Sequence, residues 1–403
     1  MPADRPRILV TDAGRGSAIA VIRSLGRRGW PVAAADFDHR SPGFSSRYVA
    51  ARVTYPDPAR HATEAAERIS AAVDRLGIDL VVPVTDETIL PLSAIRADLE
   101  RRTRLALPSA QAIAVTADKS STFELAARLG VPVPRSVPLA GSDDARQVGD
   151  RLGWPVVVKP CRSRSFAKDG TIARHLVSYA STSDELEAAA RKGPAIAQEY
   201  VQGTGHGVEL LLRSGEVIAA FQHRRIREVP VTGGASSYRE SVALDPELLE
   251  YSVALLRFLD WTGVAMVEFR VGPTGPRLME VNGRLWGSLP LAVRAGVDFP
   301  GLLADVHLGR AVDAGPLGRY ALGVRSRSLP LEVSWIGAVL SQRPAQGGLA
   351  TPRRRDALKV AAQLLVPFGW DVLARDDPAP GLREIARVAV GSVRRLLNAT
   401  GEP

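Results

Sequence analysis

The chain has 403 residues, enough for two or three domains, and its 45% hydrophobic and 24% charged content is ordinary for a soluble globular protein. A single cysteine, Cys161, excludes an intramolecular disulfide framework and fits a reducing, cytoplasmic compartment. We expect no signal peptide, no membrane-spanning helix and no nucleic-acid binding, because no apolar run is long enough and the basic residues behind the net charge of +9 are dispersed.

The first hundred residues alternate between strand and helix patterns. Short apolar runs indicate strands, and alanine-rich or amphipathic stretches between them indicate helices. The patterns lie at 7–11, 18–28, 31–36, 59–76 and 79–85. This alternation predicts a parallel sheet with crossover helices. We assign residues 1–108 to such a Rossmann-like unit.

A glycine-containing loop opens the first predicted helix. Gly14 and Gly16 with Asp36 twenty residues later suggest a dinucleotide-binding fingerprint, but the third glycine is missing and Ser17 opens the helix instead. A helix N-terminus can still offer backbone donors to another anion. An NAD(P)-binding oxidoreductase therefore remains an alternative, while a different anion or simple turn chemistry is favoured.

Two lysines about forty residues apart occupy unusual places. Lys119 lies at the first turn of a short helix within 116–134, where a cation opposes the helix dipole. Lys159 ends a buried valine strand and precedes the loop 161–170, which carries three cationic side chains able to close over phosphate. A further strand at 195–201 leads into a glycine-rich stretch, so a flat aromatic ligand could approach its main chain.

Two glutamates flank a Gly-Pro-Thr-Gly-Pro turn at 272–276. The flanking segments are rich in apolar and β-branched residues and predict a hairpin. If the turn is centred on Thr274, Glu268 lies directly opposite Glu280, with Cβ atoms about 5 Å apart. One carboxylate would then be driven toward its neutral form unless a cation lies between them.

Alternation of side chains along the second strand adds polar groups to the same face. Glu280, Asn282 and Arg284 point one way, and Met279 and Val281 point the other. Two carboxylates and an amide oxygen suit Mg²⁺, and Arg284 would bind a neighbouring anion. A solvated outer face of a two-stranded ribbon is the alternative, because a one-residue register shift would separate these groups.

These features together resemble the ATP-grasp superfamily, in its carbamoyl-phosphate-synthase-like and biotin-carboxylase-like branch. The resemblance rests on the two lysines, Glu268 and the Glu-x-Asn-x-Arg motif at 280–284, and it covers residues 1 to about 305. It implies an α/β fold in three parts. These are a Rossmann-like pre-ATP-grasp domain (1–108), a two-subdomain ATP-grasp domain (109–305, lid about 135–200) and a mainly helical C-terminal extension (306–403).

The resemblance also implies a role for each matching residue. Glu268, Glu280 and Asn282 would hold two Mg²⁺ (or Mn²⁺) ions, and Arg284 and Lys159 would act in catalysis. In the ATP site, the lysines would hold phosphates, the strand at 199–201 would meet adenine, and Glu209 would lie near the ribose. The residues assigned to ATP are Lys119, Lys159, Glu199, Tyr200, Val201, Glu209, His223 and Arg225.

The activity so implied is that of an ATP-dependent carboxylate ligase. It would phosphorylate a small-molecule carboxylate and couple the acyl phosphate to an amine, releasing ADP and phosphate. A non-catalytic ATP-binding module is an alternative from another class. Two departures from the family pattern concern the site: the covering loop is cationic rather than glycine-rich, and Gly283 follows Asn282 where relatives often have proline.

The segment after residue 305 is less informative. Helical patterns occur at 331–341, 355–365 and 382–397, and the last is amphipathic with several arginines. We favour docking of this last helix on the body of the protein. Pairing between subunits and contact with an anionic membrane surface are alternatives. A homodimer is the default expectation for such an enzyme.

Overall fold

The computed structural model describes residues 5–139, 145–313, 315–341, 352–366 and 368–399, with only the backbone given for 392–399. Its first part is a five-stranded parallel sheet of order β3-β2-β1-β4-β5, which confirms the predicted α/β unit. The strands are β1 (Ile8–Val10), β2 (Val32–Asp36), β3 (Val49–Thr54), β4 (Leu80–Val82) and β5 (Arg104–Leu105). The helices are α1 (Gly16–Arg27), η1 (Pro42–Ser45), α2 (Ala62–Leu76), α3 (Asp86–Ala94) and α4 (Arg96–Leu99).

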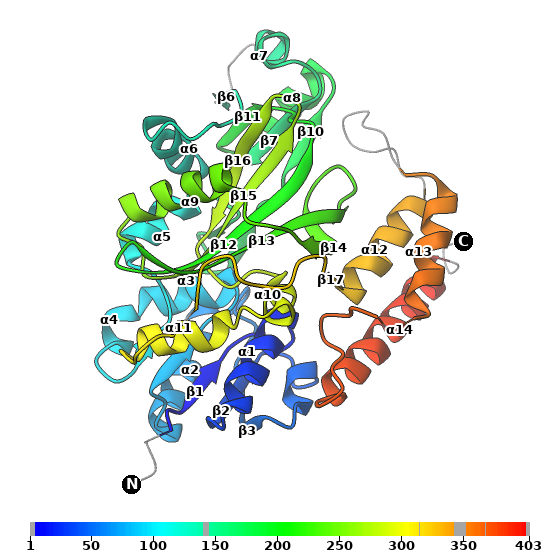
Figure 1. Cartoon of the computed structure of the whole chain (residues 1–403). Coiled ribbons are helices and arrows are strands. Elements are labelled where there is room, and N and C mark those ends of the chain that lie inside the picture. The colour runs from blue at the N-terminus through cyan, green and yellow to red at the C-terminus, as the bar shows by residue number, and fades with distance from the viewer. Residues whose placement is uncertain (1–4, 140–144, 314, 342–351, 367, 400–403) are drawn as a thin grey trace.

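A small antiparallel sheet of order β10-β7-β11-β6 forms the upper part of the molecule in Figure 1. Helices α5 (Ala110–Ala117) and α6 (Lys119–Arg128) precede it in the chain, and it has an apolar core of its own. Its strands are β6 (Ser136–Leu139), β7 (Val156–Pro160), β10 (Ser178–Ala180) and β11 (Ala195–Glu199), with α7 (Ala145–Leu152) and α8 (Ser183–Ala190). A separate hairpin of β8 (Arg164–Phe166) and β9 (Ile172–Arg174) follows β7.

A six-stranded antiparallel sheet of order β16-β15-β12-β13-β14-β17 lies at the centre. Its strands are β12 (Thr204–Arg213), β13 (Glu216–Val229), β14 (Ala235–Ser241), β15 (Gly263–Gly272), β16 (Gly275–Asn282) and β17 (Arg325–Arg327). The accompanying helices are α9 (Pro246–Phe258), α10 (Leu289–Ala295) and α11 (Phe299–His307).

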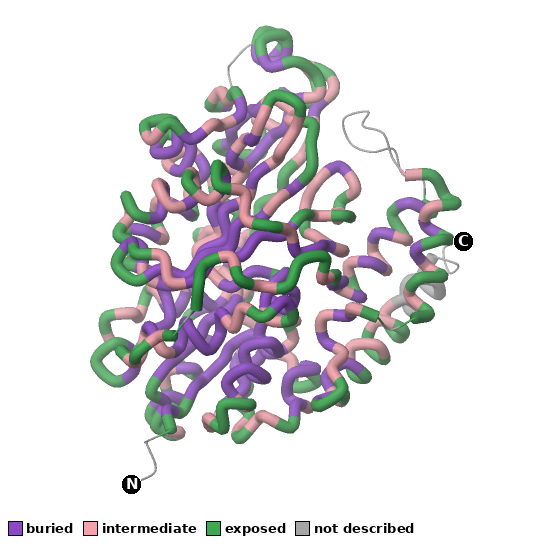
Figure 2. The backbone as a smooth tube through the Cα atoms, in the orientation of Figure 1, coloured by how far each residue is buried: buried purple, intermediate pink, exposed green. Residues whose placement is uncertain are grey.

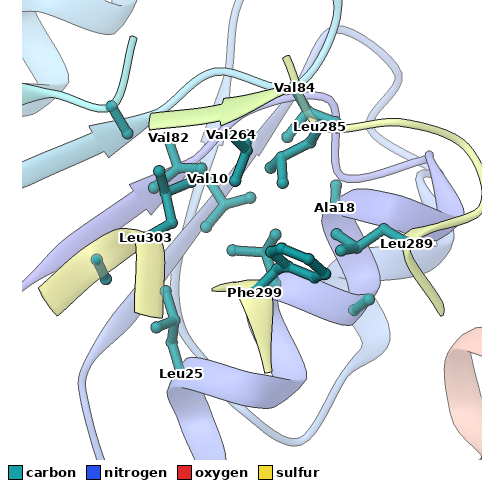
Figure 3. Packing of buried hydrophobic residues seen from close by; sticks show 14 of the residues in the cluster. Val10, Ala18, Leu25, Val82, Val84, Val264, Leu285, Leu289, Phe299 and Leu303 are labelled. Carbon is teal, nitrogen blue, oxygen red and sulfur yellow. The ribbon is translucent and has the colours of Figure 1, made fainter. Parts of the chain in front are cut away.

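The two faces of this sheet serve two different cores, because side chains alternate along each strand. Leu210 joins the cluster that includes residues of α5, α6 and α9, whereas its neighbour Leu211 joins the cluster shared with the parallel sheet. Figure 3 shows Val10 and Val82 of the parallel sheet packed with Val264, Phe299 and other residues of the central part. Figure 2 shows buried chain running continuously through both parts.

The hairpin of β15 and β16 has the predicted pairing, although its turn differs from the predicted one. Gly272 pairs with Gly275, so the turn has two residues and is not centred on Thr274. A bulge in β16 after Leu278 restores the register, and Glu268 pairs with Glu280. The additional residue is Met279. The predicted opposition of Glu268 and Glu280 is therefore confirmed, but it depends on a bulge that was not predicted.

The C-terminal segment is mainly helical, as predicted, with α12 (Leu329–Leu340), α13 (Arg354–Leu364) and α14 (Ala379–Ala399). Strand β17 of this segment pairs with β14, and the domain boundaries at 108 and 305 stay predictions. Helix α14 packs against η1 and α12, and Arg387 forms a 2.8 Å ion pair with Asp38, which confirms docking. Residues 400–403 lie outside the described residues.

The anchor of this segment is an adjacent pair of aspartates before α14. Asp377 is almost fully buried and accepts hydrogen bonds from Arg23 Nε (2.9 Å), Ser46 Oγ (2.8 Å) and the Arg47 N–H (2.9 Å). Asp376 makes a more exposed ion pair with Arg27. Within the described residues, no helix combines the length and the apolar character that a membrane crossing needs.

Candidate active site

The carboxylates of Glu268 and Glu280 meet on the sheet face that looks toward the parallel sheet. Asn282 Nδ2 donates to Oε1 of both carboxylates at 3.0 Å each. Arg225 forms an ion pair with the second oxygen of Glu268, and Lys119 Nζ lies 3.9 Å from Oε2 of Glu280. Three cationic or donor side chains thus compensate two opposed negative charges.

Burial and charge act differently on the two carboxylates. Burial raises the pKa of Glu268, and the nearby Glu280 raises it further against the opposing effect of Arg225. Burial also acts to raise the pKa of Glu280, but Lys119, the Asn282 hydrogen bond and Lys159 outweigh it and the pKa is lowered. The expected asymmetry of an opposed carboxylate pair is present. A bound cation would relieve it.

Lys119 contacts this pair, and Lys159 lies near enough to interact with it electrostatically. Lys119 begins α6, as predicted, and its Nζ donates to Ser163 Oγ at 2.9 Å. Lys159 ends β7 and is only 8% exposed, with Nζ 3.9 Å from Met279 Sδ and 5.8 Å from the centre of the Phe123 ring. Burial lowers the pKa of Lys159 to about 8, partly offset by the Glu280 carboxylate.

The contact with Lys159 corrects the prediction for Met279, which alternation had placed on the opposite face. The bulge turns Met279 and Glu280 toward the same cavity, because an extra residue breaks the alternation locally. Gly283 also has a structural reason: a Cβ there would lie 2.7 Å from the Trp261 ring. The space is too small for any side chain at residue 283.

Two arginines of the site are held by the first turn of α3. Arg284 Nε donates to Asp86 Oδ1 at 3.0 Å, and Arg164 Nε donates to Glu87 Oε1 at 2.9 Å. Sequence reasoning missed both acids. The available signal was their position just after β4, at the carboxyl edge of a parallel sheet, where ligands of open α/β sheets bind.

These side chains border a cavity of about 100 Å³. Glu280, Asn282, Arg284, Lys119, Ser163 and Arg164 line it, together with apolar residues of α3, α5 and α6. Glu268 is adjacent through its pairing with Glu280 and through Asn282. The structure therefore brings together the predicted metal ligands, both lysines and Arg284.

Other predicted site residues lie away from the cavity. Glu209 has no exposed surface, and its Oε1 lies 2.5 Å from His223 Nδ1 in the sheet interior. Burial raises the pKa of Glu209 and lowers that of His223, so both groups are favoured in their neutral forms. Of the predicted residues on β12 and β13, Arg225 alone contacts a predicted metal ligand in the described part of the chain.

The predicted adenine-binding segment lies at the end of β11. The carboxylate of Glu199 accepts hydrogen bonds from the N–H and Nε of Arg135, at 2.9 and 2.6 Å. The Tyr200 ring packs edge-on against Tyr179. Neither these residues nor Val201 line the cavity. Any contact of this segment with a ligand would therefore use its main chain or the surface beyond the cavity.

Comparison with known proteins agrees with the sequence resemblance. Residues 191–327 match a family described as ATP-grasp in the biosynthetic pathway with Ter operon. The carbamoyl phosphate synthase large chain of Gemmatimonas aurantiaca is 23% identical over 214 residues, which are 51% of this chain and 19% of that protein. The D-alanine–D-alanine ligase of Mycobacterium avium is 28% identical over 225 residues, which are 47% of this chain and 57% of that ligase. This chain thus matches less than two thirds of either relative.

Solved structures show the same fold. A biotin carboxylase–βγ-ATP complex from Campylobacter jejuni superposes with a TM-score of 0.62 at 19% identity, covering 79% of this chain and 74% of that one. An ADP complex of an N5-carboxyaminoimidazole ribonucleotide synthetase superposes with a TM-score of 0.62 at 14% identity, covering 90% and 96%. The resemblance recognised in the sequence is confirmed, and so is the α/β fold class with its helical C-terminal segment.

Proposed function

Because the chain carries an ATP-grasp domain, we propose that it is an ATP- and Mg²⁺-dependent ligase that activates a carboxylate and couples it to an amine. The observation that carries this proposal is the direct opposition of Glu268 and Glu280, with Asn282 between them, Lys119 and Arg284 beside them, and Lys159 close enough to interact electrostatically with both carboxylates. No ordinary structural need explains two directly opposed carboxylates of intermediate burial.

The donor set fits a divalent cation. Two carboxylates and an amide oxygen are hard oxygen ligands, and Mg²⁺ or Mn²⁺ would complete its shell with water and phosphate oxygens. Among the described residues, no group of three or more His, Cys, Asp or Glu side chains could hold a metal by itself. Asn282 would turn its amide to present the oxygen, since it now donates its nitrogen to both carboxylates.

Phosphoryl transfer needs mainly positioning and charge compensation, and the bound metal nucleotide would supply the phosphoryl group. Lys119 and Lys159 would hold phosphate oxygens from one side of the carboxylate pair. Arg284, fixed by Asp86, would neutralise charge on the activated acyl group from the other side. Arg225 would keep Glu268 ionised and in place.

The nucleotide base would lie along the end of β11. We assign Tyr200 and Val201 to it through their main-chain N–H and C=O groups, and Glu199 through its main chain, because Arg135 engages the Glu199 carboxylate. Glu209 and His223 would act indirectly, by supporting Arg225 and the strands beneath the phosphates.

The dinucleotide alternative is not favoured by the loop at Gly14 and Gly16. Asp36 accepts a 2.6 Å hydrogen bond from the Gly14 N–H, and a Cβ at Gly16 would meet Val372 and Asp371 of the C-terminal segment. The backbone donors and the space that a pyrophosphate would need are thus partly taken.

A screen for ADP release tests the proposal. Pools of carboxylates and amines would be incubated with ATP and Mg²⁺, and wild type compared with Glu280→Gln. Glu250→Gln, an exposed glutamate on α9, is the matched control. We expect substrate-dependent ADP release that Glu280→Gln lowers at least 100-fold and Glu250→Gln leaves unchanged. ATP binding without ADP release under any pool would favour a non-catalytic nucleotide-binding module.

A further inference from the structure

The cavity beside Arg284 has a second side that the proposed chemistry does not use. Ile89 and Leu90 of α3, Ile113 of α5 and Phe123 of α6 line it together with the polar residues of the site. These four side chains come from three helices and offer only carbon atoms to a ligand. The lining of the cavity therefore contains apolar side chains as well as the polar residues of the site.

The two threonines in the wall do not make its apolar side polar. Thr116 Oγ1 donates to the Ala112 carbonyl at 3.0 Å, and Thr122 Oγ1 donates to the Asp118 carbonyl at 2.8 Å. Both hydroxyl protons are therefore engaged within the helices. A hydrogen-bond acceptor of a ligand would therefore find no free donor in these two hydroxyl groups and would lose its water without replacement, which is costly.

The charged residues around the cavity are already paired with one another. Lys119, Arg164 and Arg284 line it, together with the carboxylates of Asp86 and Glu280. Arg284 pairs with Asp86, Arg164 pairs with Glu87, and Lys119 Nζ lies 3.9 Å from Glu280 Oε2. The charges are therefore balanced, and we place the carboxylate of the acid here because the proposed chemistry directs it to Arg284.

The size of the cavity limits the group that it can hold. Its volume of about 100 Å³ exceeds the share of one water molecule in the liquid, about 30 Å³, and is below the roughly 150 Å³ that admits benzene in an engineered cavity. A compact aliphatic group fits, whereas an aromatic ring or a long chain does not.

We propose that this cavity is the side-chain pocket for the acid substrate, and that it selects a carboxylic acid bearing a short or branched aliphatic group. The acid would direct its carboxylate toward Arg284 and the Glu268–Glu280 pair, with its aliphatic group against Leu90, Ile113 and the other apolar residues of the wall. This inference rests on the proposed ligase function and names its substrate class.

Binding measurements test the pocket separately from catalysis. Ligand-observed NMR would give dissociation constants for propionate, butyrate, isovalerate, hexanoate, phenylacetate and succinate, with Mg²⁺ and a non-hydrolysable ATP analogue present. We expect affinity to rise about fourfold for each added methylene group up to isovalerate. It should then fall for hexanoate and phenylacetate, and succinate should bind more weakly than butyrate.

Two pairs of changes on the helices localise the effect. Ala117, at the end of α5, and Ala114, one turn earlier, are both exposed, but only Ala117 lines the cavity. Ala117→Leu should weaken isovalerate binding at least fivefold, and Ala114→Leu should not. Leu90→Ala should enlarge the pocket and strengthen hexanoate binding. Affinity for the ATP analogue should stay within twofold in all three variants, and melting curves would verify that they fold.

The outcomes separate this inference from the proposed function. Four results would overturn the pocket. These are affinity that does not depend on chain length, a preference for succinate, undetectable binding of every acid, and equal effects of Ala117→Leu and Ala114→Leu. Size-dependent binding with no ADP release under any amine would support the pocket and count against the ligase. ADP release whose acid preference is unchanged by Ala117→Leu and Leu90→Ala would support the ligase and reject the pocket.

Discussion

Nucleotide binding should take up a proton through Lys159. The pKa of this buried ammonium is lowered from 10.5 to about 8, mainly by burial and also by the charge of Lys119. The difference corresponds to about 3 kcal/mol of cost for the charged form. Phosphate oxygens beside Nζ would restore much of that free energy, so binding would return the pKa toward its ordinary value.

The sign and size of the effect follow from linkage. Near pH 8 about half of the free protein carries the Lys159 proton, and nearly all of the complex does, so binding takes up about half a proton. At pH 9 only about one free molecule in ten is protonated, whereas at pH 7 nearly all are. Affinity for the nucleotide should therefore fall about tenfold from pH 7 to pH 9.

Isothermal titration calorimetry with a non-hydrolysable ATP analogue and Mg²⁺ measures both quantities. Titrations at pH 8 in two buffers of different ionisation enthalpy give the proton uptake. Lys159→Met should abolish the uptake, and Lys119→Met should move the affinity change to higher pH, because it removes one cause of the low pKa of Lys159. Lys192→Met, on the surface after α8, is the control. Equal affinity at pH 7 and 9 with no uptake in wild type would refute the role of Lys159.

Three further changes test ion pairs and packing, one at the anchor of the C-terminal segment and two at the site. Asp377→Asn should lower the free energy of unfolding by about 3–5 kcal/mol, because it leaves the buried Arg23 charge unpaired. The same change at the neighbouring, more exposed Asp376 should lower it by at most about 1 kcal/mol. Urea unfolding compares the two variants, and equal losses would contradict the assigned burial. Gly283→Ala should cost about 1–3 kcal/mol through overpacking against Trp261, and an unchanged midpoint of thermal unfolding would exclude that contact. Arg225→Met should destabilise the fold by about 3–5 kcal/mol at pH 7, because it leaves the Glu268 carboxylate unpaired. The loss should be smaller at lower pH, because the pKa of Glu268 is raised and its neutral form needs no cation. A loss that does not depend on pH would argue against the ion pair.

The pairing of Glu268 with Glu280 could be predicted from the sequence, but the geometry that produces it could not. Pairing residues symmetrically about Thr274 gave the correct partner for Glu268. The actual turn has two residues, which shifts the pairing by one residue, and the bulge at Met279 shifts it back. The correct pair thus depended on two errors that cancel. Turn type and bulges are set by backbone geometry and tertiary packing, which a strand pattern does not encode.

Local sequence patterns were sufficient to predict where the two lysines lie, but they were insufficient to predict the surroundings of Glu209. Lys119 and Lys159 lie at the start of a helix and the end of a strand, and such termini place a side chain without long-range information. Glu209 lies mid-strand, where alternation predicts its face but not what covers it. Its burial depends on His223 and Ser288, which are distant in the sequence.

The acids that hold Arg164 and Arg284 illustrate why the remaining site could not be predicted. Asp86 and Glu87 are adjacent in α3, yet their partners Arg284 and Arg164 are 198 and 77 residues away, respectively, and belong to different parts of the chain. For Arg284, this pairing depends on how the parallel sheet is oriented against the central sheet, through the apolar contacts of Val10, Val264 and their neighbours. For Arg164, it depends on where the hairpin of β8 and β9 lies. Each arginine therefore belongs to one part of the fold and is held in position by an acid of another part, the first turn of α3. A movement of α3 with the parallel sheet would disturb the partners of both guanidinium groups together. If the proposed chemistry holds, charge compensation on the acyl group and coverage of the phosphates would be coupled through one turn of α3.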